Sequence, residues 1–179
     1  AQDSLARARD LYASAAYEEA LAALNRLRAS GVAAEDGPAV EQYRAFCLLA
    51  LGSASEADAA IQAVVMAVPS YTPSEADVSP RVRSAFSDVR RRVLPTIIQQ
   101  KYGEAKAAFD RKDYAAAGDG FTQVLKVLAD PDVASIANQP PLADLRTLAQ
   151  GFQDLSARAL APPVTPAPPP QSQPAQAPT

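Results

Sequence analysis

Histidine and tryptophan are both absent from this sequence of 179 residues. Without histidine the chain lacks the side chain that most often serves as a general base and as a zinc ligand, which excludes Ser-His and Cys-His nucleophile pairs. The sequence also contains no glycine-rich phosphate loop, no EF-hand calcium loop and no paired-carboxylate motif. We therefore predict a protein that is not an enzyme and that uses no cofactor and no metal ion.

Cysteine is represented by Cys47 alone, so an internal disulfide is impossible. This residue lies in the apolar run 46–49, and a thiol in such a helical stretch is far more often buried than reactive. We predict a buried structural thiol. Its presence leaves the cellular compartment undecided.

Acidic residues outnumber basic ones, with 20 aspartates and glutamates against 17 lysines and arginines, which gives a net charge of −3. Nucleic-acid binding usually begins with a basic excess, so we expect no nucleic-acid partner. Apolar runs such as 46–51 are far shorter than the roughly 20 residues that span a bilayer, so we expect no transmembrane segment.

The first residues, Ala1 to Asp3 without a methionine, are typical of a chain after signal-peptide removal, although a trimmed chain would look the same. Export to the periplasm or the medium is the favoured prediction.

Strand-forming patterns are also missing, because β-branched residues are sparse and never alternate with polar residues over a useful run. Glycine is scarce as well, with seven residues in the chain. Alanine, the best helix former, is the commonest residue instead. Three segments share one spacing, in which a small residue is followed four positions later by a large apolar residue and three positions after that by another. They are Ala20, Leu24 and Leu27; Ala57, Ile61 and Val64; and Ala117, Phe121 and Val124.

Each of these segments follows another stretch of helical periodicity, at 3–15, 38–51 and 95–111, so the chain reads as three helical hairpins. The pattern resembles the tetratricopeptide repeat family, with copies at about 3–36, 38–69 and 98–131 and a period near the usual 34 residues. The characteristic tryptophan is absent, and Ala15 stands where glycine is common. The resemblance implies an all-α fold, a tetratricopeptide-like α-solenoid.

In that family the first helix of each hairpin lines a concave groove that holds peptides. The resemblance therefore implies a protein-binding groove, in which aromatic and cationic side chains are the usual anchors. Its candidate residues are Arg9, Tyr12, Gln42, Phe46, Leu49, Tyr102, Lys106 and Phe109. For Tyr12, Leu49 and Phe109, packing between hairpins is an equally good interpretation.

An insertion separates the second and third copies, since Ala57 and Ala117 lie 60 residues apart whereas Ala20 and Ala57 lie 37 apart. We predict one extra helix at 79–93, with Ser79 as its N-cap, and a new helix that starts at Pro95. The extra helix carries Arg81, Arg83, Arg90, Arg91 and Arg92. A solvated, salt-bridged surface is the favoured interpretation of these arginines, and an acidic partner or an anionic lipid surface remains the alternative.

The remaining segments are a loop, a last helix and a tail. We expect the loop at 69–73 to be rigid and to pack Tyr71 onto the second hairpin. A last helix from 142 to about 159 would cap the repeats with one apolar face, formed by Leu142, Leu145, Leu148, Phe152 and Leu155. We place a repeat domain at 1–160 and a disordered, polyproline-like tail at 161–179, where eight of the last 18 residues are proline.

Together these features predict a non-catalytic protein–protein interaction scaffold of the bacterial cell envelope, binding a peptide or a protein subunit. The proline-rich tail resembles the spacers of bacterial envelope proteins, and it would either tether a further segment or be a ligand itself. The alternative is a structural subunit whose apolar faces are covered in a permanent complex. Oligomeric state and partner identity stay open at this point.

Overall fold

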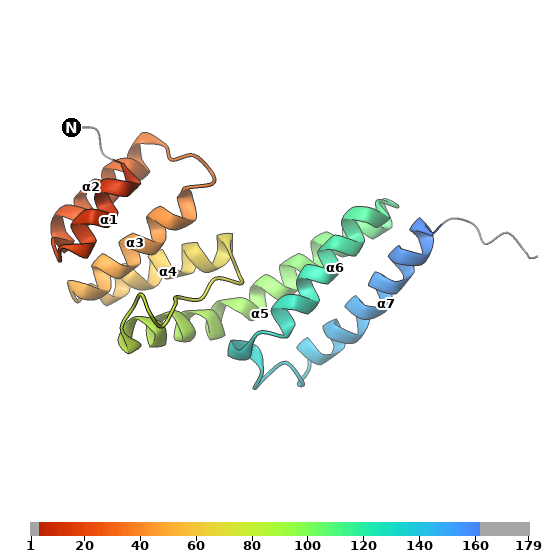
Figure 1. The fold of residues 1–179 in the computed structure, drawn as a ribbon. Helices are drawn as coiled ribbons and strands as arrows, with labels where there is room; N and C mark the ends of the chain where they lie inside the picture. The colour runs from red at the N-terminus through yellow and green to blue at the C-terminus, as the bar shows by residue number, and fades with distance from the viewer. Residues whose placement is uncertain (1–3, 162–179) are drawn as a thin grey trace, which may run out of the picture.

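Residues 4–161 are described by the computed structural model, and they form seven α-helices, one short 3-10 helix and no β-strand (Figure 1). The prediction of an all-α fold is confirmed for this part of the chain. The predicted proline-rich tail, from residue 162 onward, lies outside the described residues. The elements are α1 (Leu5–Ala13), α2 (Tyr17–Ser30), α3 (Gly37–Ala50), α4 (Ala54–Ala67), α5 (Pro80–Asp110), α6 (Tyr114–Leu128), η1 (Pro131–Val133) and α7 (Leu142–Leu160).

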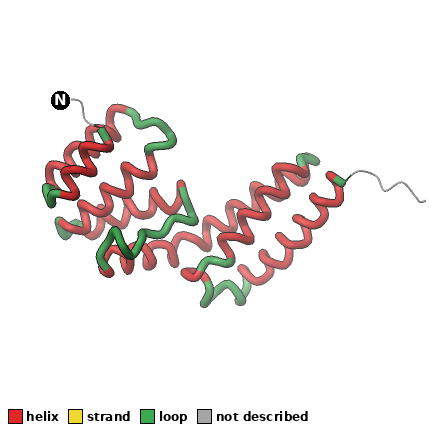
Figure 2. Tube along the Cα trace, viewed as in Figure 1, coloured by secondary structure: helices red, strands yellow, loops and turns green. Residues whose placement is uncertain are grey.

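Each α-helix packs against the next one along the chain, while α1 also contacts α3 and α5 also contacts α7. The two longest connections within residues 4–161 join α4 to α5 and α6 to α7 (Figure 2). Helix α5 extends from the group formed by α1 to α4 as far as α6 and α7, so it links the two ends of the molecule (Figure 1). Among the described residues, no helix has both the length and the apolar character needed to cross a membrane.

Small residues occupy the helix crossings, as the repeat spacing predicts. Six alanines of the three hairpins, one in each helix, are buried: Ala8, Ala20, Ala45, Ala57, Ala105 and Ala117. The large residues Leu24, Ile61 and Phe121 are buried too, four positions after the small residues of the second helices. Helices α5 and α6 approach closely, since a Cβ added to Gly120 would lie 2.7 Å from the Cβ of Ala105. Alanine and glycine therefore set how near the backbones can come.

Three turns of the same kind connect α1 to α2, α3 to α4 and α5 to α6. The second residue after each first helix has a positive φ: Ala15 at 61°, Gly52 at 79° and Lys112 at 64°. In the first turn Ala15 N–H donates to the Tyr12 carbonyl at 3.0 Å, and Ala16 N–H donates to the Leu11 carbonyl at 2.9 Å. This is the Schellman pattern, and the other two turns repeat it. The three hairpins thus close with the same geometry.

The predicted helix start at Pro95 is wrong, because α5 runs without interruption through this residue. An internal proline costs about 3 kcal/mol, since it has no N–H and its ring meets the carbonyl one turn earlier. The apolar stripe of α5 continues on both sides of it, with Phe86 before it and Ile97 and Ile98 after it, all buried. Burying each such side chain contributes about 1.5–3 kcal/mol. The burial of these side chains therefore outweighs the cost of the internal proline. The predicted extra helix and the first helix of the third hairpin form one continuous helix, α5.

The predicted apolar face of the last helix is only partly right. Leu142 is buried and Leu145 and Phe152 are half-buried, but the side chains of Leu148 and Leu155 are each 47% exposed. Helix α7 packs through its small residues instead, since Ala149 and Ser156 are fully buried and the latter lies beside Gly118 of α6. Neighbouring residues on a helix point about 100° apart. Centring the contact on positions 149 and 156 therefore turns positions 148 and 155 to solvent.

Arg90 departs from the solvated surface predicted for the five arginines, because it is 1% exposed. Three consecutive arginines cannot share one face of a helix, and Arg90 lies one turn from each of the buried residues Phe86 and Leu94. Its neighbours do remain at the surface. Arg91 is 61% exposed beside Asp88, and Arg92 pairs with Asp58 at 2.7 Å.

The buried Arg90 guanidinium joins three separate segments. Its Nε donates to Asp132 of η1 at 2.7 Å, and an Nη2 N–H donates to Asp130. Its Nη1 donates to the carbonyls of Pro69 at 2.7 Å and Tyr71 at 2.6 Å, both in the connection between α4 and α5. The Tyr71 ring packs on Phe86 of α5, with centroids 5.8 Å apart. Four of the five guanidinium N–H groups thus donate in fixed directions, where lysine could offer only a point charge.

We predict that Arg90→Met lowers the free energy of unfolding by about 3–5 kcal/mol, because Asp130 and Asp132 lose the buried guanidinium that they share while remaining mostly buried themselves. The matched control is Arg91→Met, next in sequence but exposed, which should cost less than about 1 kcal/mol. Urea unfolding followed by circular dichroism measures both. Equal losses in the two variants would contradict the role assigned to Arg90.

We further predict that Ala15→Gly raises the free energy of unfolding by about 0.5–1 kcal/mol. An L-residue in the left-handed region costs about 1–2 kcal/mol, and the greater chain entropy of glycine offsets part of the gain. The control Ala22→Gly, on the exposed face within α2, should instead lower it by about 1 kcal/mol. The same urea experiment applies, and a loss of stability in Ala15→Gly would refute the turn geometry.

Candidate functional site

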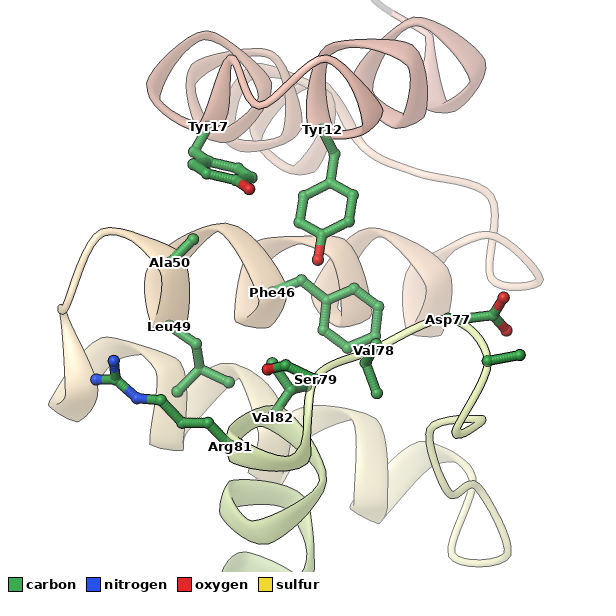
Figure 3. A pocket seen from close by; sticks show the side chains of 11 residues that line it. Tyr12, Tyr17, Phe46, Leu49, Ala50, Asp77, Val78, Ser79, Arg81 and Val82 are labelled. Atoms are coloured by element: carbon green, nitrogen blue, oxygen red, sulfur yellow. The ribbon is translucent and has the colours of Figure 1, made fainter.

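A cleft of about 370 Å³ opens between the α1–α2 turn, α3 and the start of α5 (Figure 3). Helix α3 forms its back, and the segment leading into α5 closes one side. Its lining therefore comes from residues that are distant in the sequence. They are Tyr12, Tyr17, Phe46, Leu49, Ala50, Ala76, Asp77, Val78, Ser79, Arg81 and Val82.

Aromatic rings form the upper and rear walls of the cleft. Tyr12, near the end of α1, has its ring centroid 5.5 Å from that of Tyr17 and 5.8 Å from that of Phe46. Tyr43 of α3 supports Tyr12 edge-on at 5.7 Å. The Schellman turn at Ala15 reverses the chain between the two tyrosines, so it brings both rings to the same opening. A local turn thus builds half of the wall.

The hydroxyls of Tyr12 and Tyr17 make no hydrogen bond to any residue of the described part of the chain, and both face the space between the α1–α2 turn and α3 (Figure 3). The pKa of Tyr12 is raised above its usual value, chiefly because burial disfavours the phenolate and secondarily because of Tyr17, Cys47 and Tyr43. This hydroxyl therefore stays protonated well above neutral pH. The cleft offers a ligand two hydroxyls that are free to donate hydrogen bonds.

Charge plays a small part in the cleft, because its lining holds one cation and one anion. Arg81 is exposed on one rim, and no ion pair joins it to another of the described residues. The Asp77 carboxylate points away from the opening (Figure 3). A ligand would therefore be selected by its apolar surface and its hydrogen-bond acceptors more than by its charge.

Metal-ligating side chains do not cluster in the residues that the structure describes. Among them, no group of three or more histidine, cysteine, aspartate and glutamate side chains is placed to hold a metal ion. Cys47 is fully buried, as predicted, and burial raises its pKa to about 11. Its thiol therefore remains protonated at neutral pH and is a poor nucleophile.

The structure brings together three of the eight predicted groove residues. Tyr12, Phe46 and Leu49 line the cleft, where Phe46 is 4% exposed and serves as a wall. Arg9 lies nearby on the exposed surface of α1, with its guanidinium 5.3 Å from the ring centroid of Tyr43. Gln42 is half-buried one turn before Phe46 and is not part of the cleft lining.

The other three predicted residues lie on α5 near its C-terminal end, where α6 and α7 cover them. Tyr102 packs on Phe121 of α6 at 5.7 Å. Phe109 packs on Phe152 of α7 at 5.0 Å, and Lys106 lies 5.3 Å from the centroid of that same ring. The capping helix therefore fills the part of the surface that these residues would have contributed. The eight positions do not form one continuous groove.

Sequence reasoning missed Tyr17, Arg81 and the segment 76–79 as lining residues. Tyr17 begins the second helix of a hairpin, whereas the predicted groove included residues of first helices only. The segment 76–79 carries no periodic signal, and only the fold brings it opposite α1. A weak signal existed in Ser79-Pro80, which predicts a helix start and hence a turn of the chain at this point.

Comparisons with models of protein families, with curated proteins and with solved structures found no match to this chain.

Proposed function

We propose that this protein is a non-catalytic protein–protein interaction scaffold with tetratricopeptide-like hairpins, and that it binds an extended peptide segment of its partner in the cleft below Tyr12 and Tyr17. The thrice-repeated turn and the buried small positions support the resemblance to these repeats. The proposed location is the bacterial cell envelope, in the periplasm or outside the cell. It rests on the proline-rich composition of the tail.

The observation that carries the binding proposal is the pair of half-buried tyrosines whose hydroxyls bond to no described residue, at a cleft lined by both polar and apolar side chains. An extended peptide presents backbone carbonyls, which accept hydrogen bonds from such hydroxyls, and apolar side chains, which can pack on the apolar part of the lining. Tyrosine also loses little conformational entropy on binding, because it has only two rotatable side-chain bonds. The cleft volume of about 370 Å³ is within the range of sites for small ligands and is large enough for a few peptide side chains.

We predict that Ala50→Arg abolishes peptide binding. Ala50 is exposed, is the last residue of α3 and lines the cleft, so a long side chain there obstructs the opening without disturbing the core. The matched control is Ala107→Arg, which adds the same charge on an exposed helix position outside the cleft. Peptides selected from a random display library on the native chain should bind the control and lose at least about tenfold in affinity for Ala50→Arg. A library without cleft-dependent binders would refute the proposal.

The alternative function, a structural subunit of a permanent assembly, is favoured by the outer face of α7. Leu148 and Leu155 are each 47% exposed there, and Leu160 is 58% exposed. This alternative predicts concentration-dependent assembly in analytical ultracentrifugation, which the double variant Leu148→Glu, Leu155→Glu should abolish while its circular dichroism stays unchanged. A monomer at every concentration, alone and with cell-envelope extract, would count against it.

A further inference from the structure

The run of proline at 162–170 is the sequence feature that the proposed function leaves unexplained. Six of its nine residues are proline and none is charged. The run begins two residues after α7 ends, and it lies outside the described residues. Proline cannot donate a backbone hydrogen bond, so the carbonyls of such a run are free to accept from another surface.

The chemistry that recognises such runs is well defined. Proline-rich segments bind in grooves lined by aromatic rings, because the flat rings pack on the proline rings while hydrogen-bond donors reach the exposed carbonyls. The cleft has these components: the half-buried rings of Tyr12 and Tyr17, backed by the buried ring of Phe46, and two tyrosine hydroxyls that bond to no described residue. Of its two charged lining residues, Asp77 turns its carboxylate away from the opening and Arg81 lies on the rim, so the lining does not require a charged ligand.

We propose that the cleft binds the proline run 162–170 of a second copy of this chain. The inference rests on the proposed function, namely that the cleft binds peptides, and it adds both the class of ligand and its source. Binding of this kind joins copies head to tail, since α7, which precedes the run in the sequence, ends far from the cleft.

Geometry argues against a chain binding its own run. The cleft lies at the start of α5, whereas Phe152 of α7 packs on Phe109, near the end of α5. From Val82 to Phe109 the helix rises about 40 Å, at about 1.5 Å per residue. Helix α7 then continues to Leu160 on the side away from the cleft (Figure 1). Nine residues span at most about 32 Å even when fully extended. The run therefore ends short of the cleft of its own chain.

A fluorescein-labelled peptide of residues 162–170, titrated with the full chain and followed by fluorescence anisotropy, tests the ligand class. We expect saturable binding, at least about tenfold weaker for Ala50→Arg and unchanged for Ala107→Arg. Tyr12→Phe keeps the ring but removes the donor, so it should weaken binding about fivefold. Raising the salt concentration should change the affinity of an unlabelled peptide with blocked ends, measured by competition with the labelled one, less than about twofold, because that peptide is uncharged. No binding at about 1 mM chain, or equal binding of a peptide with every proline replaced by alanine, would overturn the proposal.

Complementation between two defective chains tests the source of the ligand. One chain carries Ala50→Arg and keeps its proline run; the other keeps its cleft and has alanine at every proline of 162–170. In analytical ultracentrifugation the native chain should associate with increasing concentration, each defective chain should stay monomeric, and their mixture should form one-to-one pairs. A monomeric native chain whose cleft binds the added peptide more tightly once its own prolines are replaced would show self-binding and overturn the proposal.

The outcomes also separate this inference from the function on which it rests. If the display library yields cleft-dependent peptides but the 162–170 peptide does not bind, the cleft is a peptide site and the proline ligand is refuted. If no peptide of either kind depends on Ala50, both proposals fail. Association that survives Ala50→Arg but is lost in the Leu148→Glu, Leu155→Glu variant would assign assembly to α7 and refute the proline link.

Discussion

Arg90 holds together three segments that are far apart in the sequence: the connection between α4 and α5, the middle of α5, and η1 after α6. Its guanidinium reaches two carboxylates and two backbone carbonyls, and it is almost wholly removed from water. Taking an arginine out of water is costly, and the cost is offset only while these partners stay in place. The interaction therefore favours one arrangement of the connection over the many that a twelve-residue link between helices could adopt.

The cleft depends on that arrangement. Its lower side is the end of the same connection, which carries Asp77 and Val78 into the N-terminal turn of α5. Arg90 anchors the beginning of the connection through Pro69 and Tyr71, and the Tyr71 ring on Phe86 extends the anchor toward Phe46, the back wall of the cleft. The upper side comes from a hairpin turn that is local. One wall is thus set by a buried ion cluster and the other by a Schellman turn.

Much of the fold could be predicted from the sequence because it follows from local spacing. The small residues at Ala20, Ala57 and Ala117 lie where helices cross, and the buried Cys47 lies within an apolar run. The errors occur where a local signal was outweighed by packing: Pro95 resembles a helix start but is carried within α5, and Leu148 resembles a core residue but faces solvent. Of the candidate site, Tyr12, Phe46 and Leu49 could be named in advance, whereas Tyr17 and Arg81 could not.

By itself, the sequence determined the helical class, the hairpin spacing and the absence of histidine chemistry, because these depend on residue type and on distances of a few positions along one helix. Only the tertiary structure decided which arginine is buried, which part of the first-helix surface stays open, and where α7 ends relative to the cleft. Such features depend on which segments meet in space, and a helix face shows the same periodicity whether a neighbour or water covers it.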